Sequence, residues 1–375
     1  MQMMPADSGP FRVLARRFDL DDRQIAYARL AGVRTEGDFY SFLVSNPELG
    51  IRGLYDTPDL TERLVGAGAV NLLLERAERA PAADRVAFGA VAPADAAFGE
   101  GAEVPDLTDE EISELASFEP GPLASEEPAG FDRCGPWPVR DQGARGTCVS
   151  FAICATYELF LCSERNVEAD LSEQFLYWAI KHHGLDGRPN NDGTRHEFAA
   201  LALTHHGVCS ESVWRYDDRV LSTISHDPPP AGAASAARAL VTSAAVTKDH
   251  APKTSGKARV LLDLLRRHNG VSIALPVFSA PGGALHNWGT PTARAYGEVQ
   301  GPLPGWYVDG GHAVCCLGFV PDPDEPLGGH FVFRNSWGTS WGNGLPRPDY
   351  FGLEPGYGQV SASYVDRYLW ETCVF

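Results

Sequence analysis

The clearest helical pattern of apolar positions in the chain starts at a cysteine. From Cys148 onward, apolar residues recur at helical spacing, at Phe151, Ala152, Ala155 and Leu159, so one face of this segment is expected to pack inward with Cys148 on the first turn. The partial positive charge at a helix N-terminus favours the thiolate, which is the nucleophilic form of cysteine. The pattern therefore predicts a helix that begins with a reactive thiol.

The region after this helix continues with helices first and strands later. Periodicity and boundary residues predict further helices over 171–182, 195–206 and 257–268, and strands over 270–277, 312–319, 330–335 and 358–364. This order indicates an α+β domain in two lobes. A stretch rich in proline and alanine, 222–237, is predicted to be an exposed insertion.

Small and amide residues stand directly ahead of the cysteine. Gly143 and Gly146 allow the backbone to turn tightly before the helix. Gln142, six residues before Cys148, can direct its amide N–H toward an oxyanion. The segment is typical of a nucleophile with its oxyanion donor.

Two later segments offer the other groups that such a thiol needs. A nucleophilic thiolate is normally activated by an imidazole, and His312 is placed where a predicted buried strand begins. Asn335 ends the next apolar segment and can hold the histidine ring in one tautomer, while Trp337 can shield that bond from water.

These segments resemble the papain-like cysteine proteases. Residues 138–152, 309–319 and 335–342 match the family in the order Gln, Cys, His and Asn, and Leu171-Ser172-Glu173-Gln174 is similar to the segment that follows the catalytic helix. The resemblance implies a role for each of four residues. The oxyanion donor is Gln142, the nucleophile is Cys148, the base and acid is His312, and the orienting residue is Asn335. It also implies substrate contacts at Gly146, Gly193, Gly311 and Trp337.

The nucleophile segment departs from the family pattern. Where the family has Cys, Gly, Ser or Ala, Cys, Trp, this chain has Arg145-Gly146-Thr147-Cys148-Val149. The family's disulfide cysteine is therefore missing at position 145, which suggests a variant that works reduced. Arg145 is expected to add a cation near the cleft and to alter substrate choice.

The resemblance implies an α+β fold in two lobes, one helical and one β-barrel-like, over residues 131–375. Residues 1–80 are predicted to form a small all-α domain from four short helices. This domain is either an adaptor or an inhibitory prodomain. Residues 81–130, acidic and rich in Pro, Gly and Ala, are predicted to be a linker.

Composition narrows the range of partners and compartments. The net charge of −18 argues against nucleic acid and anionic membrane, both of which need a basic patch. We find no secretory signal near Met1 and no apolar run long enough to span a membrane. The protein is therefore expected to be cytoplasmic, with its eight cysteines as thiols.

The sequence has clusters of residues that can bind metals, but their spacing does not match that of known metal sites. His182-His183 and His205-His206, with Cys209 nearby, lack the spacing of known metal sites. The acidic stretch 322–326 lacks the glycine and the terminal glutamate of a calcium loop. We expect no metal and no cofactor.

The predicted function is hydrolysis of peptide bonds by a thiol peptidase, through a thioester acyl-enzyme. Two alternatives stay open, since the same groups serve them: an acyl transferase or transpeptidase, and a peptide-binding adaptor with weak or no hydrolysis. The expected partners are a protein or peptide substrate and a protein that binds the N-terminal helices. Those residues, together with the linker, are also expected to restrain the enzyme by autoinhibition.

Overall fold

The computed structural model describes residues 138–187, 189–190, 192–218, 228–248, 256–280, 285–302, 306–322, 325, 327–342 and 355–375. The all-α domain predicted over 1–80 and the linker predicted over 81–130 lie outside these residues, as do the first residues of the predicted catalytic domain.

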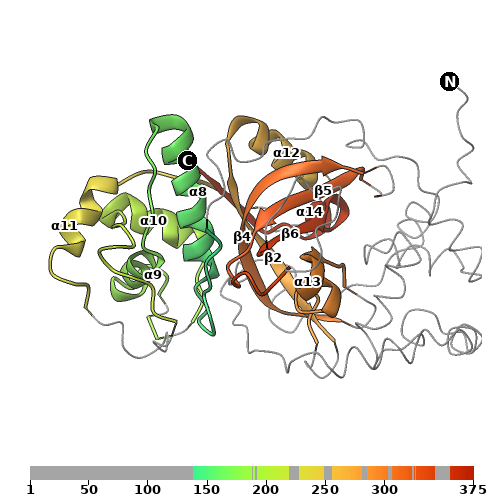
Figure 1. Cartoon of the computed structure of the whole chain (residues 1–375), viewed down its shortest axis with the longest axis horizontal. Coiled ribbons are helices and arrows are strands. Elements are labelled where there is room, and N and C mark those ends of the chain that lie inside the picture. Colours follow the sequence, from blue (N-terminus) through green and yellow to red (C-terminus); the bar gives the residue numbers. More distant parts are fainter. Residues whose placement is uncertain are drawn as a thin grey trace, which may run out of the picture.

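Helices and strands separate into two parts (Figure 1). Helices α8 to α11 lie together on one side, and strands β2, β4, β5 and β6 lie on the other side with α12 to α14. Helix α8 stands at the boundary, in contact with α9 and α10 and also with strands β2 and β4. The helices span Cys148–Arg165 (α8), Glu173–His182 (α9), His196–His206 (α10), Ala233–Ala237 (α11), Lys257–Arg267 (α12), Pro291–Tyr296 (α13) and Ala362–Tyr368 (α14).

The described strands form one seven-stranded sheet in the order β1-β7-β2-β4-β5-β6-β3. All neighbours pair antiparallel except β3 and β6, which are parallel. Strands β1 and β3 lie at the two edges, so the barrel-like closure expected of this lobe is not confirmed. The strands span Ala245–Lys248 (β1), Val271–Ser279 (β2), Glu298–Val299 (β3), Tyr307–Pro321 (β4), Gly329–Arg334 (β5), Tyr357–Ser361 (β6) and Glu371–Val374 (β7).

Local sequence explains where the helices of the first part begin and end. Ser172 caps α9 by accepting a hydrogen bond from the backbone N–H of Phe175 at 3.0 Å, which satisfies a donor that the helix N-terminus leaves unpaired. Helix α10 ends before Gly207, whose φ is 70° and where a Cβ would lie 2.0 Å from the carbonyl oxygen of Ala237. The three helices predicted after α8 are confirmed, with ends shifted by at most two residues.

Some predicted boundaries are wrong. The strand predicted over 358–364 ends at Ser361, whose hydroxyl accepts from the backbone N–H of Tyr364 and so caps α14. His312 lies inside β4, which already begins at Tyr307, because pairing with β2 extends the strand through residues of low strand propensity. The stretch predicted as an exposed insertion contains α11, which buries two of its alanines.

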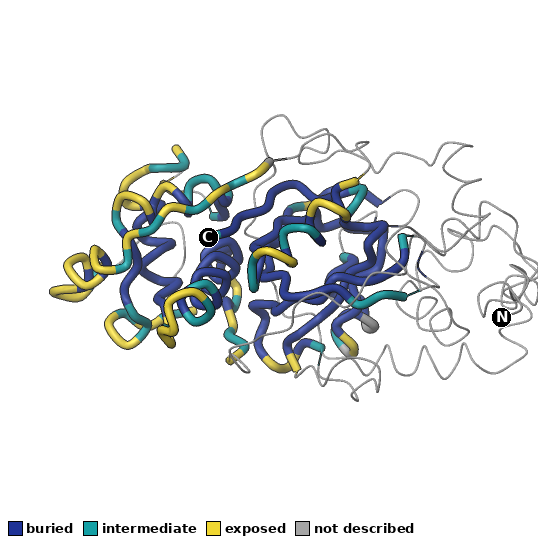
Figure 2. The backbone as a smooth tube through the Cα atoms, turned by 90° about the horizontal axis from the view of Figure 1, so that it is seen from above, coloured by how far each residue is buried: buried dark blue, intermediate teal, exposed yellow. Residues whose placement is uncertain are grey.

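The core runs along α8 and the central strands (Figure 2). All residues of β2 and β5 are buried, and so is most of α8. No described helix has both the length and the apolar character that crossing a membrane requires. The expectation that all cysteines are thiols is wrong for Cys162, which is disulfide-bonded, since linear sequence does not show which sulfur atoms the fold brings together. The other described cysteines are buried thiols.

Candidate active site

The first turn of α8 carries the predicted nucleophile. The helix begins at Cys148 itself. The turn ahead of it depends on Gly143, whose φ is 59° and where a Cβ would lie 2.9 Å from the Cβ of Asp218. The Cys148 thiol is fully buried, and the backbone N–H of Ala313 points at its sulfur across 3.4 Å. Because Ala313 directly follows His312 on β4, the predicted thiol lies beside the strand that carries the predicted imidazole.

The His312 ring is held by Asn335. Its Nε2 lies 2.7 Å from the amide oxygen Oδ1 of Asn335, which directly follows β5, the neighbour of β4 in the sheet. An amide oxygen only accepts, so Nε2 carries the proton and Nδ1 carries the lone pair. Nδ1 is buried and has no hydrogen-bond partner among the described residues. The ring is therefore in the tautomer that leaves Nδ1 able to take a proton.

Aromatic rings enclose this pair. The centroid of the Trp337 ring is 4.4 Å from that of His312, and the Trp288 ring lies edge-on at 4.9 Å. The pKa of His312 is lowered to about 3, mainly by burial and in part by nearby His286, against the opposing effect of the bond to Asn335. The imidazole is thus neutral at neutral pH, the form that a general base needs.

This depressed pKa predicts a pH dependence of stability. In the unfolded chain His312 binds a proton as the pH falls below about 6.5, whereas in the folded chain it stays neutral down to about pH 3. The folded state therefore loses stability as the pH falls through this window. Between pH 7 and pH 5 the wild type should lose about 2 kcal/mol more of its free energy of unfolding than His312→Gln does. Urea unfolding of both proteins at the two pH values measures this, and parallel losses would contradict the burial of a neutral imidazole.

Gln142 is bonded on both sides of its amide. Its oxygen Oε1 accepts from the Ser336 hydroxyl at 2.6 Å, and its nitrogen Nε2 donates to the carbonyl oxygen of Arg145 at 2.7 Å. The backbone N–H of Gln142 also donates to the carbonyl oxygen of Ser336 at 2.8 Å. The amide nitrogen carries two N–H groups, so holding the first one fixes the direction of the second.

The four residues predicted to contact substrate differ in their surroundings. Gly146 and Gly193 have backbone groups that already bind protein side chains: the N–H of Gly146 donates to Asp192 Oδ2 at 2.8 Å, and the carbonyl of Gly193 accepts from Lys181 at 2.5 Å. Gly311 pairs with β2 within the sheet. The Trp337 ring packs on His312, with the ring centroids 4.4 Å apart. Their contact with substrate stays a prediction.

Arg145 is not placed as the sequence suggested. Its side chain is 2% exposed and donates from Nη1 to Gln174 Oε1 at 2.6 Å and to the carbonyl oxygen of Asp217 at 2.7 Å. Neighbouring aromatic and polar groups hold this cation inside the protein, and an effect of Arg145 on substrate choice stays a prediction.

The sequence model of the papain family cysteine proteases matches residues 131–347, more than half of the chain. The chain belongs to this family.

Individual relatives of this papain-family chain are distant. It is 24% identical over 211 residues to Peptidase 1 of Dermatophagoides pteronyssinus and 23% identical over 205 residues to an uncharacterised peptidase C1-like protein of Acanthamoeba polyphaga mimivirus. These matches cover 55% and 54% of this chain and 55% and 60% of those proteins. Xylellain, a cysteine protease from Xylella fastidiosa, has a similar solved structure: TM-score 0.51, 20% identity, 74% of this chain and 96% of xylellain covered. The fold is therefore the mixed α and β fold of the papain family.

Sequence reasoning missed Ser336 in this papain-family site. Its hydroxyl and carbonyl bind Gln142, and its backbone N–H donates to Asn335 Oδ1 at 2.8 Å. One residue therefore links the predicted oxyanion donor to the predicted orienting residue. Its only signal in the sequence is its place between Asn335 and Trp337.

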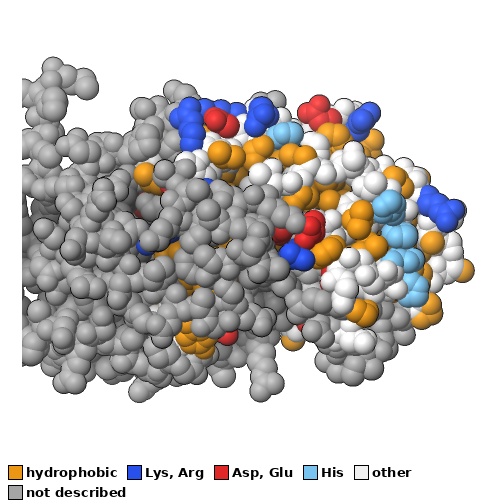
Figure 3. Space-filling model, turned by 180° about the vertical axis from the view of Figure 1, so that it is seen from behind, with side chains coloured by type: hydrophobic (Ala, Val, Ile, Leu, Met, Phe, Trp, Pro, Cys, Tyr) orange, Lys and Arg blue, Asp and Glu red, His pale blue; other side chains and the backbone are white. Residues whose placement is uncertain are grey.

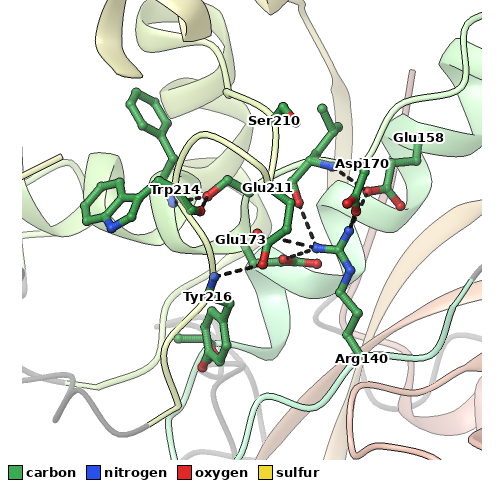
Figure 4. Close-up of polar contacts among 12 residues, drawn as sticks. Arg140, Glu158, Asp170, Glu173, Ser210, Glu211, Trp214 and Tyr216 are labelled. Carbon is green, nitrogen blue, oxygen red and sulfur yellow. Dashed lines mark hydrogen bonds and ion pairs between the residues drawn. The ribbon is translucent and has the colours of Figure 1, made fainter. Parts of the chain in front are cut away.

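The segment that leads to α8 is anchored by Arg140 (Figure 4). The guanidinium contacts the carboxylates of Glu158, Asp170 and Glu173 and donates to the carbonyl oxygen of Leu171 at 2.9 Å. Burial raises the pKa of Glu173 to about 8, an effect that Arg140 opposes. These contacts tie the start of the site to helix α9.

Histidines gather on one face of the helical part (Figure 3). The rings of His183 and His206 stack with centroids 3.8 Å apart, and His182 stacks on Trp178 at 4.5 Å. Within the described part of the chain no three His, Cys, Asp or Glu side chains are arranged to hold a metal ion. The rings pack against one another instead of converging on a common point.

Proposed function

We propose that this chain is a cysteine peptidase in which Cys148, His312 and Asn335 act together. The observation that carries the proposal is the His312 ring: Nε2 is bonded to Asn335 Oδ1 at 2.7 Å, Nδ1 has no hydrogen-bond partner among the described residues, and the Cys148 sulfur lies beside the next residue of the strand. A thiol at a helix N-terminus next to such a base is an activated nucleophile.

The first half of the reaction transfers the acyl group to the enzyme. Nδ1 of His312 takes the thiol proton, and the thiolate of Cys148 attacks the carbonyl carbon of a peptide bond. An amide N–H of Gln142 and the backbone N–H of Cys148, at the first residue of α8, stabilise the oxyanion. The carbon–nitrogen bond then breaks, and the imidazolium gives its proton to the departing amine.

The second half releases the acyl group. His312 takes a proton from water, the hydroxide attacks the thioester, and Cys148 leaves as a thiolate that recovers the proton from the ring. An amine in place of water would give acyl transfer through the same groups. We propose hydrolysis because the family of this chain is one of proteases.

We also propose that residues before Phe131 restrain the enzyme. Cys148 and His312 are completely buried, which fits an enzyme at rest. Support for a restraint from the N-terminal side comes from the acidic, proline-rich composition of 106–127, which suits an extended peptide.

Truncation before Phe131 is therefore expected to raise both hydrolysis of fluorogenic peptides and labelling by a thiol-directed peptidyl epoxide. The reason is that the thiol becomes accessible without any change in its chemistry. The measurement compares the full chain and the truncated chain at equal concentration of titrated Cys148, with Cys148→Ala as the blank. Equal rates would rule out restraint while leaving the peptidase proposal intact; no hydrolysis and no labelling by either chain would contradict the peptidase itself.

A further inference from the structure

The loop 142–147, between the proposed oxyanion donor and the nucleophile, is held by side chains from three other segments. Asp192 accepts the N–H of Gly146. Helix α9 supplies Gln174, which accepts from Arg145. The third is the segment 214–218, which we call the bracing segment. A loop fixed at so many points keeps one conformation.

The Arg145 side chain makes several of these contacts. Its guanidinium carbon lies 4.7 Å from the centre of the Tyr216 ring and 5.7 Å from that of Tyr177, and its Nη1 binds both Gln174 and the carbonyl oxygen of Asp217. A cation over aromatic rings is stabilised by the ring quadrupole. Moving this buried guanidinium would break both hydrogen bonds of Nη1, which is costly in a buried place. The side chain therefore ties the loop to α9 and to the bracing segment at once.

Tyr216 holds both ends of the same loop. Its hydroxyl donates to the carbonyl oxygen of Gln142 at 2.9 Å and lies 2.7 Å from Thr147 Oγ1. Its own backbone N–H donates to Glu211 Oε1 at 2.9 Å (Figure 4), and its ring meets Phe151 of α8 edge-on at 4.7 Å. The ring that lies under Arg145 is thus fixed independently of Arg145.

The loop in turn aims the amide of Gln142. Gln142 Nε2 donates to the carbonyl oxygen of Arg145 at 2.7 Å, so the position of the Arg145 backbone sets where the second amide N–H points. A displacement of this carbonyl would turn the amide away from a developing oxyanion.

We propose that Arg145 is a positioning residue for peptide hydrolysis: its buried side chain, braced on Tyr216, Gln174 and Asp217, fixes the carbonyl that orients the Gln142 amide. The inference rests on the proposed function and assigns a task to a residue at which this chain departs from the family signature. Its effect is specific to steps that develop an oxyanion.

Two reactions of Cys148 separate this role from a general loss of structure. Hydrolysis of an amide passes through an oxyanion, and loss of one oxyanion donor costs about 10²–10³ in kcat. Displacement of iodide from iodoacetamide occurs at a saturated carbon and needs the thiolate but no oxyanion donor. A positioning defect at Gln142 therefore lowers kcat and leaves the alkylation rate unchanged.

The test measures kcat, KM and alkylation rate for Arg145→Gln in the full chain, alone and combined with Gln142→Ala. We expect Arg145→Gln to lower kcat by about 10-fold or more with alkylation and KM within about two-fold of wild type. In the Gln142→Ala background the same change should cost less than about two-fold, since groups that act as a unit are not additive. Arg145→Lys should recover part of kcat.

Arg165→Gln is the matched control, because it also removes an arginine over an aromatic ring, Phe160 at 5.9 Å, at the other end of α8.

Several results would overturn the inference. One is an unchanged kcat in Arg145→Gln; another is an equal fall of kcat and alkylation; a third is the full loss repeated in the Gln142→Ala background. If Arg145→Gln does not fold, Gln174→Met takes its place in every comparison, since it removes the oxygen that accepts from Arg145 Nη1 and leaves Gln142 untouched, and the same outcomes decide. A wild type that alkylates but hydrolyses no peptide, even after truncation before Phe131, would overturn the proposed function and this inference with it, whereas an active wild type with an unaffected variant overturns this inference alone.

Discussion

Replacing Cys148 with alanine is expected to abolish peptide hydrolysis and active-site labelling together. The proposed acyl-enzyme forms on its sulfur, and loss of a nucleophile that works with a base lowers kcat by about 10⁴-fold or more. Fluorogenic peptide hydrolysis and epoxide labelling measure the two effects. Cys154→Ala is the control, because Cys154 lies on the same helix but burial raises the pKa of its thiol well above the ordinary range, so that it stays an unreactive thiol. Hydrolysis that persists in Cys148→Ala would exclude this sulfur as the nucleophile.

Replacing His312 with glutamine is expected to have the second largest effect. The variant loses the base that takes the thiol proton and the acid that protonates the leaving amine, so kcat should fall by about 10⁴-fold. Alkylation of Cys148 should also slow at neutral pH. It should recover near pH 9, where a thiol ionises without help.

The alkylation profile distinguishes an activating imidazole from a structural one. His330→Gln is the control, because His330 is buried on β5, the neighbour of β4, and faces Asp322 at 3.6 Å. It should keep the wild-type pH profile. A His312→Gln variant whose alkylation remains fast at neutral pH would contradict the role of His312 as the base.

The sequence predicted the parts of the site that depend on local patterns. Helical spacing placed Cys148 at a helix start, and the family signature picked out Gln142, His312 and Asn335, which the structure brings into one cluster. The order of strands in the sheet could not be read in this way. It depends on pairing between segments far apart in the chain, such as β2 with β7.

The sequence failed where a side chain's partners are distant. Arg145 was expected to add a cation near the cleft, and nothing in its local sequence indicated that it is buried. Its actual partner Asp217 is 72 residues away in the chain, and the hydroxyl of Tyr216 reaches Gln142 across 74 residues. Spacing within a segment carries no information on such contacts. The Cys162 disulfide was missed for the same reason.

Whether this chain is a cysteine peptidase that acts by hydrolysis is tested most directly by following oxygen from water into the products. A peptide substrate and an added amine are incubated with the truncated chain in water enriched in oxygen-18, and the masses of the products are measured by mass spectrometry. We predict a new amine and a new carboxylate that carries one atom of oxygen-18, formed by wild type and absent with Cys148→Ala. Products that lack oxygen-18 and instead join the acyl part to an added amine, or a peptide that returns intact, would contradict a cysteine peptidase that acts by hydrolysis.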